Sequence, residues 1–403
     1  MIDLVIVGAG PAGLGAAISA AENRLEVCVI DEFVKPGGRL LGQLHEEPDG
    51  KWVNGIAEAQ KHYERAIQLG VNIKCGVSVY DLKKLENGWC VYTTDKAIES
   101  KCLLLATGAS ETPIPVPGWT LPGVMSIGAA QIMGNVHRVK PGEKGVIIGV
   151  NVLSVAIARE LQLCGVHIES ILLPQPSLVS GNAANPEKMM ASLLRLSHLA
   201  PSPLIRFGGK WVSPKLGARL YPKNGFKMWD IPIQLRKTAL EILGENQVEG
   251  VRIAEISATG KVVSGTEKTV SADFVCIAGG LTPLSELAAV AGCSFCYVPE
   301  LGGHVPLHNE FMQTNLTGLY VAGNITGVES AKVARAQGTV AGLAIARELN
   351  TLADHADEKI DAAIAGVIET RRHAIIQFQP GIEKAHTELH RRFYESRGET
   401  ILN

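Results

Sequence analysis

The residues best suited to chemistry lie near the N-terminus, in the stretch Gly8-Ala9-Gly10-Pro11-Ala12-Gly13, which Asp31 follows 18 residues after the last glycine. A glycine at position 8 permits a tight turn, one at position 10 lets a pyrophosphate approach the backbone, and one at position 13 lets a helix pack closely on a sheet. The N–H groups that open such a helix attract phosphate. Asp31 is placed to bind a ribose diol, so the pattern predicts a dinucleotide site.

Two strands and a helix must hold these residues in place. The apolar run 3–7 is typical of a buried parallel strand, a small-residue helix is expected from the glycines to about residue 22, and LEVCVID predicts the strand that ends on the acid. Three later stretches favour FAD as the dinucleotide: Pro36–Arg39, with a glycine pair that can lie against a flat ring, and two strands that end in ATGA (106–109) and GLYVAGN (318–324). All three place strand ends at the sheet edge where open α/β folds bind ligands.

The motifs GAGPAG, ATGA and GLYVAGN, in this order and spacing, resemble the two-dinucleotide-domain flavoproteins of the pyridine nucleotide–disulfide oxidoreductase superfamily over about residues 1–345. The resemblance implies an α/β fold with two Rossmann-like three-layer domains, the second inserted in the first. We expect an FAD domain at 1–111 and 273–345, a second nucleotide-binding-like domain at 112–272, and a helical C-terminal extension at 346–403. The implied cofactor-binding residues are Gly8, Gly10, Pro11, Ala12, Gly13, Asp31, Glu32, Gly38, Arg39, Val79, Ala106, Thr107, Gly108, Gly323 and Asn324.

Asn324 departs from the superfamily pattern, which usually has aspartate there to hydrogen-bond the ribityl chain of the flavin. Asparagine can still accept a hydrogen bond but carries no charge. The expected cofactor is FAD, with another adenine nucleotide as the alternative.

A second strand–turn–helix–strand segment, residues 145–173, repeats the plan of the first without its ligand signals. Asn151 stands where Gly10 stands in the first turn, and Ser154 stands where Gly13 does. Neither an acid for a ribose nor a basic cluster for a 2′-phosphate follows the second strand. The segment therefore predicts a retained fold that has lost its nicotinamide nucleotide, the alternative being a site that binds it by unusual contacts.

The segment PVPGWTLPGVMSIGAAQ (115–131) narrows the resemblance to the flavin subunits of heteromeric amine- and imino-acid-oxidising enzymes, such as opine oxidase, hydrogen cyanide synthase, proline or hydroxyproline dehydrogenase and sarcosine oxidase. This group implies a smaller flavoprotein partner that oxidises the substrate at a CH–NH or CH–NH₂ bond. Some members have a cysteine-rich iron–sulfur segment near the C-terminus, but residues 346–403 contain no cysteine. An iron–sulfur protein would therefore come from another chain. The alternatives are a stand-alone NAD(P)H-dependent flavin reductase and a nucleotide-binding scaffold subunit.

Cysteines and histidines offer weaker candidates. Residues 35–45 and 125–140 contain no cysteine, which argues against a disulfide-reductase dithiol, and the single CxxC, Cys293–Cys296, reads mainly as structural. His45, His304 or His308 could act as a proton donor to a flavin, although solvated loop histidines are commoner. Arg39 could stabilise an anionic reduced flavin or form a plain surface ion pair. No metal site and no catalytic residue is predicted.

Composition limits the class of protein. The chain has 403 residues, 46% hydrophobic and 19% charged, with a formal net charge of −2. These values favour a compact enzyme and give no electrostatic attraction to nucleic acid or to an anionic membrane. The eight cysteines sit mostly in apolar runs, and no segment reads as a signal peptide or a membrane span, so we expect a cytoplasmic location.

Two regions are left open by their patterns. Residues 176–250 could form an interface or an irregular excursion that packs on its own domain. In the extension, Ile360, Ile364, Val367 and Ile368 form an apolar stripe at helical spacing, which could cover the chain's own core or face a partner.

Overall fold

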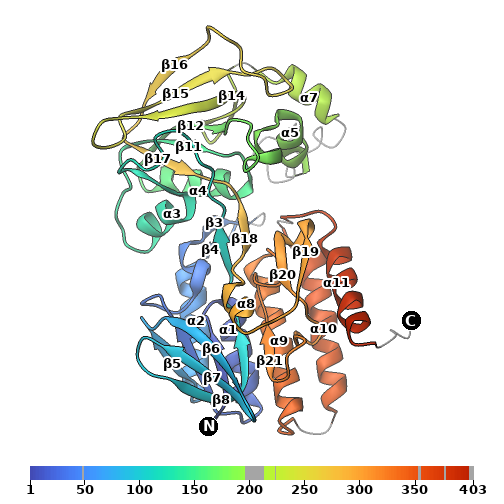
Figure 1. Cartoon of the computed structure of the whole chain (residues 1–403). Coiled ribbons are helices and arrows are strands. Elements are labelled where there is room, and N and C mark those ends of the chain that lie inside the picture. Colours follow the sequence, from blue (N-terminus) through green and yellow to red (C-terminus); the bar gives the residue numbers. More distant parts are fainter. Residues whose placement is uncertain (48–49, 196–212, 223, 353–354, 376–377, 399–403) are drawn as a thin grey trace. The chain divides into compact units, whose positions relative to one another are not determined.

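The computed structural model describes residues 1–47, 50–195, 213–222, 224–352, 355–375 and 378–398. The chain divides into two compact units. The first unit comprises residues 1–41, 55–110 and 281–403, and the second comprises residues 42–54 and 111–280. Figure 1 labels their helices and strands.

The first unit is built on a sheet with strand order β5-β2-β1-β8-β7-β6, to which β21 adds by pairing with β8. Strands β5, β2, β1, β8 and β21 run parallel, and β7 and β6 continue the sheet antiparallel. The bounds are β1 (Ile2–Val7), β2 (Val27–Asp31), β5 (Asn72–Cys75), β6 (Val79–Leu85), β7 (Gly88–Thr93), β8 (Ile98–Leu105) and β21 (Leu319–Val321).

Alternating side chains of the parallel strands enter two cores. On one face, Leu4 and Ile6 of β1 pack with α1 (Pro11–Glu22), α9 (Ala331–Glu348) and α10 (Ala356–Arg372). On the other, Val5 and Val7 pack with β6, β7 and α8 (Glu286–Val290). A sheet covered on both faces explains why residues 4–7 of β1 are all apolar and buried. This unit also holds α2 (Gly55–Gln68), α11 (Ile382–Ser396), β19 (Phe295–Val298), β20 (Gly303–Pro306), η1 (Gly38–Gly42, which ends at the boundary) and η5 (Pro299–Leu301).

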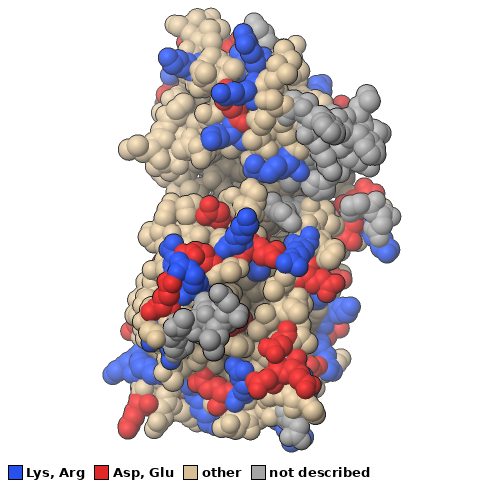
Figure 2. All heavy atoms as spheres, turned by 90° about the vertical axis from the view of Figure 1, so that its right-hand side faces the viewer, with Lys and Arg blue, Asp and Glu red and all other residues tan. Residues whose placement is uncertain are grey.

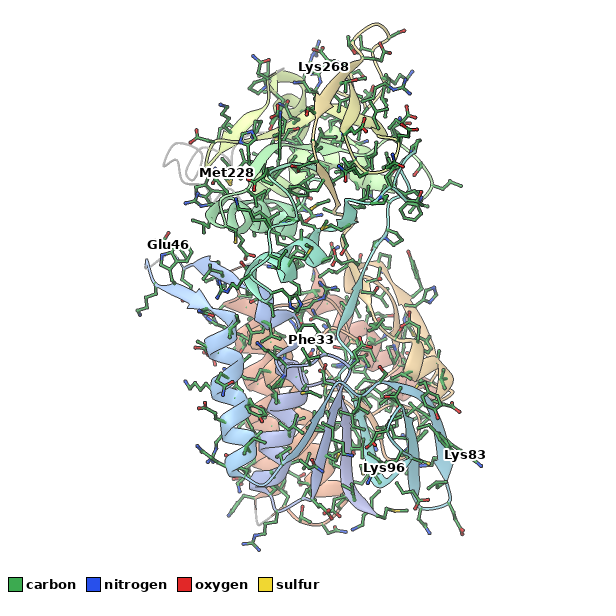
Figure 3. The ribbon with its side chains drawn as sticks, turned by 90° about the vertical axis from the view of Figure 1, so that its left-hand side faces the viewer. Phe33, Glu46, Lys83, Lys96, Met228 and Lys268 are labelled. Atoms are coloured by element: carbon green, nitrogen blue, oxygen red, sulfur yellow. The ribbon has the colours of Figure 1, made fainter. Side chains whose placement is uncertain are left out.

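The second unit repeats the scheme with strand order β10-β17-β11-β12-β14-β15-β16, and β13 pairs with β14. Its parallel strands are β10 (Val124–Ser126), β17 (Phe274–Ile277), β11 (Lys144–Ile148), β12 (His167–Leu173) and β14 (Ile231–Leu243), and the antiparallel ones are β13 (Phe226–Met228), β15 (Gly250–Glu255) and β16 (Lys268–Ser271). The helices are α3 (Ile127–Asn135), α4 (Val152–Leu163), η2 (Gly181–Ala184), α5 (Pro186–Arg195) and α7 (Pro214–Leu220). A hairpin of β3 (Leu44–Glu46) and β4 (Trp52–Asn54) belongs to this unit, and Figure 3 labels Glu46 on it.

The α/β class with two Rossmann-like units agrees with the prediction, and the chain passes from the first unit to the second after residue 110, one residue before the predicted division. Residue 273 is the predicted return to the first domain. Instead, β17 pairs with both β10 and β11, so the second unit extends to Gly280. The connecting strands β9 (Ala109–Glu111) and β18 (Leu281–Pro283) pair with each other where the chain passes between the units.

The two regions that the sequence left open pack on their own units. In the segment 176–250, the described residues Met190, Ala218 and Ile231 belong to the core of the second unit. Residues 196–212 and 223 of this segment lie outside the described ones. In the extension, Ile360 and Val367 of α10 are buried, so the apolar stripe faces the protein interior. Figure 2 shows acidic and basic side chains interspersed over the face of the first unit that carries α10 and α11.

Candidate functional site

The first glycine turn joins β1 to α1 and leaves the helix N-terminus open. Gly8 has φ +107°, a conformation that L side chains rarely adopt, and a Cβ there would lie 2.4 Å from the carbonyl oxygen of Ala106. A Cβ on Gly13 would lie 1.8 Å from the carbonyl oxygen of Gly8, so only glycine lets α1 start this close to the strand. Gly10 is the N-cap of α1 and has no side chain to accept the first helical N–H groups.

Gly10 also makes space for a ligand. A Cβ built on it has one neighbour within 4 Å, the Cα of Gly38 at 3.9 Å, so a side chain there would enter open space in front of the helix. Gly38, at the start of η1, has φ +55°, and a Cβ on it would lie 3.0 Å from the Cα of Gly10. Two glycine backbones therefore border an uncapped helix N-terminus with unpaired N–H groups and the positive end of the helix dipole. This arrangement suits a pyrophosphate.

The acid at the end of β2 is fixed by the same turn. Asp31 accepts a hydrogen bond from the N–H of Ala9 (2.6 Å to Oδ2) and one from the N–H of Phe33 (2.8 Å to Oδ1). Burial raises the pKa of Asp31, while these two N–H groups act in the opposite direction. Figure 3 shows Phe33 where β2 has ended, at the edge of the sheet. The carboxylate is thus held beside the turn, as a ribose-binding acid requires.

Other predicted residues converge on the turn. The N–H of Gly37 donates to the carbonyl oxygen of Ala9 (2.8 Å), and a Cβ on Gly323 would lie 2.7 Å from the Cβ of Ala12. Pro11 opens α1, where its missing N–H and fixed φ fit the first helical position. The structure therefore brings together the turn 8–13, Asp31, Gly38, Ala106 and Gly323 from five separate stretches of the chain.

Five other predicted residues remain. The side chains of Thr107 and Arg39 bond carbonyl groups outside the turn, and Glu32, Val79 and Gly108 are described by their positions. The hydroxyl of Thr107 donates to the carbonyl oxygen of Leu284 (2.5 Å), and the guanidinium of Arg39 donates to the carbonyl oxygen of Ala109 (3.0 Å from Nη2). Glu32 is exposed, and Val79 pairs with Thr93 at the start of β6. Gly108 follows Thr107 with φ +82°. Their cofactor contacts remain predictions.

Asn324 helps to order the loop between β21 and α9. Its Oδ1 accepts a hydrogen bond from the N–H of Glu329 (3.1 Å). Gln337, a buried residue of α9 that sequence reasoning missed, accepts a hydrogen bond from the N–H of Gly323 (2.9 Å). A glutamine next to the small residues Gly338 and Ala336 in the helix sequence AKVARAQGTVAG is the signal that could have revealed it.

Helix α9 packs closely on α1 and so holds the helix that follows the first glycine turn in place. A Cβ on Gly338 would lie 2.0 Å from the carbonyl oxygen of Ala12, and one on Gly342 would lie 2.7 Å from that of Ala16. The two helices touch through backbone because their contact residues are glycine and alanine. This contact fixes α1, whose N–H groups face the open side of the turn.

The second turn has the same backbone plan but is closed by its own side chains. Gly149 has φ +118°, and a Cβ there would lie 2.1 Å from the carbonyl oxygen of Ala278. Asn151 caps α4: its Oδ1 accepts from the N–H of Ser154 (2.9 Å), and its Nδ2 donates to the carbonyl oxygen of Ala278 (2.9 Å). The Ser154 hydroxyl receives the N–H of Asn151 in return (2.9 Å), which completes a capping box.

The acid position of the second unit is apolar. The N–H of Gly8 donates to the carbonyl oxygen of Ile30, one residue before Asp31, and the N–H of Gly149 donates to that of Leu172. Leu173 therefore occupies the place of Asp31, and it is fully buried. Because this position has no ribose acceptor and the cap already binds the N–H of Ser154, the second turn offers less to a dinucleotide than the first.

Most of the chain matches one protein family. The model of the pyridine nucleotide-disulphide oxidoreductase family covers residues 2–193 and 223–338. The chain belongs to this family. The match confirms the resemblance and the prediction of FAD as cofactor, which the open first turn can hold. When bound, FAD supplies two-electron redox chemistry, and the residues around Gly10 and Asp31 hold and orient it.

Individual relatives share less than 30% sequence identity with this chain. The chain is 29% identical to a subunit of opine oxidase from Agrobacterium tumefaciens (strain Ach5) over 86% of its own length and 66% of the relative's. It is 24% identical to hydrogen cyanide synthase subunit HcnB of Pseudomonas aeruginosa over 99% of its length and 81% of the relative's. L-proline dehydrogenase from P. horikoshii shares the fold, with a TM-score of 0.63 at 19% identity over 90% of this chain and 58% of that one. The chain spans less than two thirds of the first of these relatives.

The cysteine and histidine candidates lie on strands and loops of both units. Burial raises the pKa of the Cys293 thiol to about 11, opposite to the direction that a redox thiol needs, and both Cys293 and Cys296 are free. His304 lies in β20 beside Tyr297, and His45 is exposed in β3. His308 is fully buried, and its Nδ1 lies 2.7 Å from the carbonyl oxygen of Pro306.

Among the helices that the structure describes, none has the length and apolar character of a membrane span.

Proposed function

We propose that this chain is the FAD-binding subunit of a heteromeric enzyme that oxidises an amine or imino acid, and that a partner chain carries out the oxidation at the CH–NH or CH–NH₂ bond. This subunit then receives or passes on electrons through its flavin. The proposal joins one structural observation to the character of the relatives.

The observation that carries the proposal is the closed second turn. In a reductase fed by NADH or NADPH, this turn would receive the coenzyme's pyrophosphate. Here the Asn151 side chain already accepts the N–H of Ser154, and Leu173 stands where an acid would bind ribose. A coenzyme would have to compete with the capping box, at a cost of about 1 kcal/mol, and would find no acid for its ribose. Electrons for the flavin therefore come from another source.

The chain's own thiols do not supply that source. The disulfide-reductase segments 35–45 and 125–140 contain no cysteine, and Cys293 is buried with a raised pKa. A flavin without a dithiol and without a nicotinamide site needs an external donor. Two relatives are subunits by name, of opine oxidase and of hydrogen cyanide synthase, and one of the structural neighbours is a proline dehydrogenase. These names support a nitrogen-bearing substrate and a partner chain.

The decisive experiment compares electron donors under anaerobic conditions. The purified chain is mixed with NADH and with NADPH while the flavin band near 450 nm is followed. The native complex, isolated with its partner chains, is mixed with L-proline, sarcosine and an opine. We expect the nicotinamides to leave the flavin oxidised and one of the amino acids to bleach it in the complex.

The other outcomes identify the alternatives. Rapid bleaching by NADH or NADPH in the isolated chain would favour a stand-alone flavin reductase and overturn the proposal. A purified chain without flavin absorbance, which also takes up none when FAD is added, would indicate a scaffold subunit. Mass spectrometry of the native complex identifies the partner chains.

A further inference from the structure

Three histidines from two distant parts of the sequence meet inside the first unit. His386 and His390 are one helical turn apart on α11, and His308 follows β20. One ring nitrogen of each lies within 4.8 Å of those of the other two. The ring centroid of His308 lies 6.3 Å from that of His386 and 5.7 Å from that of His390.

The cluster is buried by an apolar contact. The face of α11 that carries Leu389 and Phe393 packs on Leu301 and Val305 from η5 and β20, and all four side chains are at most 1% exposed. Figure 1 shows α11 beside the hairpin of β19 and β20. His308 and His386 are at most 3% exposed, and His390 is partly buried with its Nε2 atom shielded from solvent.

The Nε2 atoms of all three rings are buried without a hydrogen-bond partner among the described residues. A buried nitrogen without a partner destabilises a fold, and three at one point are unusual. A single ligand that accepts all three lone pairs would remove this cost.

The hydrogen bond of His308 fixes a tautomer that can bind a metal ion. The contact between Nδ1 of His308 and the carbonyl oxygen of Pro306 (2.7 Å) requires the proton on Nδ1, which leaves Nε2 with its lone pair toward the cluster. Neutral imidazoles bind first-row divalent metals, whereas charged ones do not.

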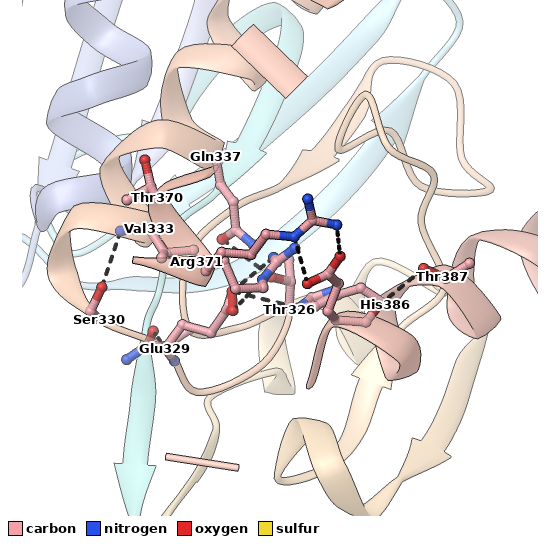
Figure 4. Close-up of polar contacts among 12 residues, drawn as sticks. Thr326, Glu329, Ser330, Val333, Gln337, Thr370, Arg371, His386 and Thr387 are labelled. Atoms are coloured by element: carbon pink, nitrogen blue, oxygen red, sulfur yellow. Dashed lines mark hydrogen bonds and ion pairs between the residues drawn. The ribbon is translucent and has the colours of Figure 1, made fainter. Parts of the chain in front are cut away.

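The carboxylate of Glu329 lies beside the cluster. Oε2 of Glu329 lies 3.6 Å from Nε2 of His386, and the same carboxylate forms a two-bond ion pair with Arg371 of α10 (2.5 and 2.9 Å). Figure 4 shows Glu329 between Arg371 and His386. Glu329 belongs to the loop that Asn324 orders, so the cluster links α11 to the loop that follows β21.

We propose that His308, His386 and His390 bind one first-row divalent metal ion, with zinc preferred, through their Nε2 atoms, and that Glu329 or a water completes the coordination. Zinc takes nitrogen ligands at about 2.0–2.1 Å in tetrahedral geometry, which requires the nitrogens to be about 3.4 Å apart. The candidate nitrogens lie within 4.8 Å of one another, so they must approach by up to about 1.4 Å when the ion binds. The metal fastens α11 to β20 and to the loop that carries Glu329.

Metal content and spectroscopy test the site without reference to enzyme activity. The full chain is stripped with a chelator, dialysed and titrated with Zn²⁺ or Co²⁺. We expect one tightly bound ion per chain by elemental analysis, visible Co²⁺ absorption bands typical of tetrahedral coordination, and a Tm that rises by a few degrees when zinc saturates the site.

Variants assign the site to the three histidines. His386→Gln and His390→Gln are expected to weaken zinc binding by about 100-fold or more, because each removes a direct ligand. His355→Ala and His373→Ala change exposed histidines at the two ends of α10 and should bind zinc as the wild type does. Circular dichroism checks that the variants are folded.

Two results would overturn the proposal. One is a folded wild-type protein that takes up neither zinc nor cobalt after chelator treatment. The other is metal binding that survives in folded His386→Gln and His390→Gln proteins. Neither result depends on the proposed oxidation reaction, so the metal site and the proposed function can fail separately.

Discussion

The two glycine turns of this chain show which requirements belong to the fold and which belong to the ligand. Gly8 and Gly149 have nearly the same φ, +107° and +118°, and in each a Cβ would collide with the carbonyl oxygen of an alanine on the neighbouring strand. A chain that bends from strand to helix at this point needs glycine whether or not anything binds. The first glycine of each turn has therefore been kept.

The turns differ at the residues that face a ligand. Gly10 leaves the N-terminus of α1 uncapped, whereas Asn151 and Ser154 satisfy each other's backbone N–H groups at α4. Asp31 accepts the N–H of Ala9, while Leu173 in the same position is buried and apolar. A helix N-terminus needs partners for its N–H groups, and they come from a ligand in the first unit and from side chains in the second.

The helices that follow the two turns, α1 and α4, also differ in what packs against them. Helix α1 packs on α9 through glycine and alanine backbone, and Ser19 donates to the carbonyl oxygen of Thr339 (3.1 Å). At the corresponding place, α4 buries Glu160, which accepts hydrogen bonds from the Gln131 and Asn135 side chains (2.8 Å each). Burial without a cation raises the pKa of Glu160 to about 7. The second helix therefore carries a polar contact where the first has a close backbone contact.

The largest expected effect comes from making the first turn as bulky as the second. Gly13→Ala places a Cβ 1.8 Å from the carbonyl oxygen of Gly8, so α1 must move away from the sheet. We expect about 3 kcal/mol of lost stability and a protein purified without FAD, measured by chemical unfolding and by flavin absorbance. Ser154→Ala is the control and should leave the FAD content unchanged. Full FAD occupancy in Gly13→Ala would contradict the steric role of this glycine.

A second substitution transfers the cap. Gly10→Asn puts the residue of the second turn into the first, and the N-cap φ of −75° accepts asparagine without strain. We expect a folded protein whose FAD affinity falls by about 100-fold, because the new side chain takes N–H groups that otherwise face the phosphates. Fluorescence titration of apoprotein with FAD measures the change. Unaltered affinity would show that the uncapped N–H groups do not hold the cofactor.

A pH experiment tests the buried carboxyl of Glu160 on α4. The pKa of Glu160 rises on folding from its ordinary value of 4.5 to about 7, so the folded state binds more protons than the unfolded one between these values. This carboxyl therefore contributes most stability below pH 4.5, and its contribution falls by about 3 kcal/mol as the pH rises to 7 and beyond. Unfolding curves of wild type and Glu160→Gln at several pH values should differ in slope over this range. Parallel curves would mean that Glu160 titrates normally.

The smallest effect is expected from opening the second turn. Asn151→Ala removes the cap of α4 and should lower stability by about 1 kcal/mol while the FAD content stays unchanged. Thermal unfolding and flavin absorbance measure the two quantities. Because Leu173 still occupies the acid position, the variant should also leave the flavin oxidised in the presence of NADH. Reduction by NADH would show that the cap alone had excluded the coenzyme.

Much of the first site could be predicted because its signals are local. Glycines at positions 8, 10 and 13, a strand before them and an acid after them are a pattern of backbone conformation within about 30 residues. The roles of Thr107 and Arg39 could not be read in this way, since their donors reach carbonyl groups of Leu284 and Ala109 that no sequence spacing indicates. Gln337 and Glu160 were missed for the same reason.

The sequence by itself determined the two turns, the buried parallel strands and the family, because each depends on residue type and short spacing along the chain. Only the tertiary structure decided where the second unit ends, how Asn151 closes its own helix, and that His308 meets His386 and His390. The histidines lie about 80 residues apart, and their meeting depends on the packing of α11 on β20. Long-range packing is set by the whole apolar surface of a helix, which no short motif encodes.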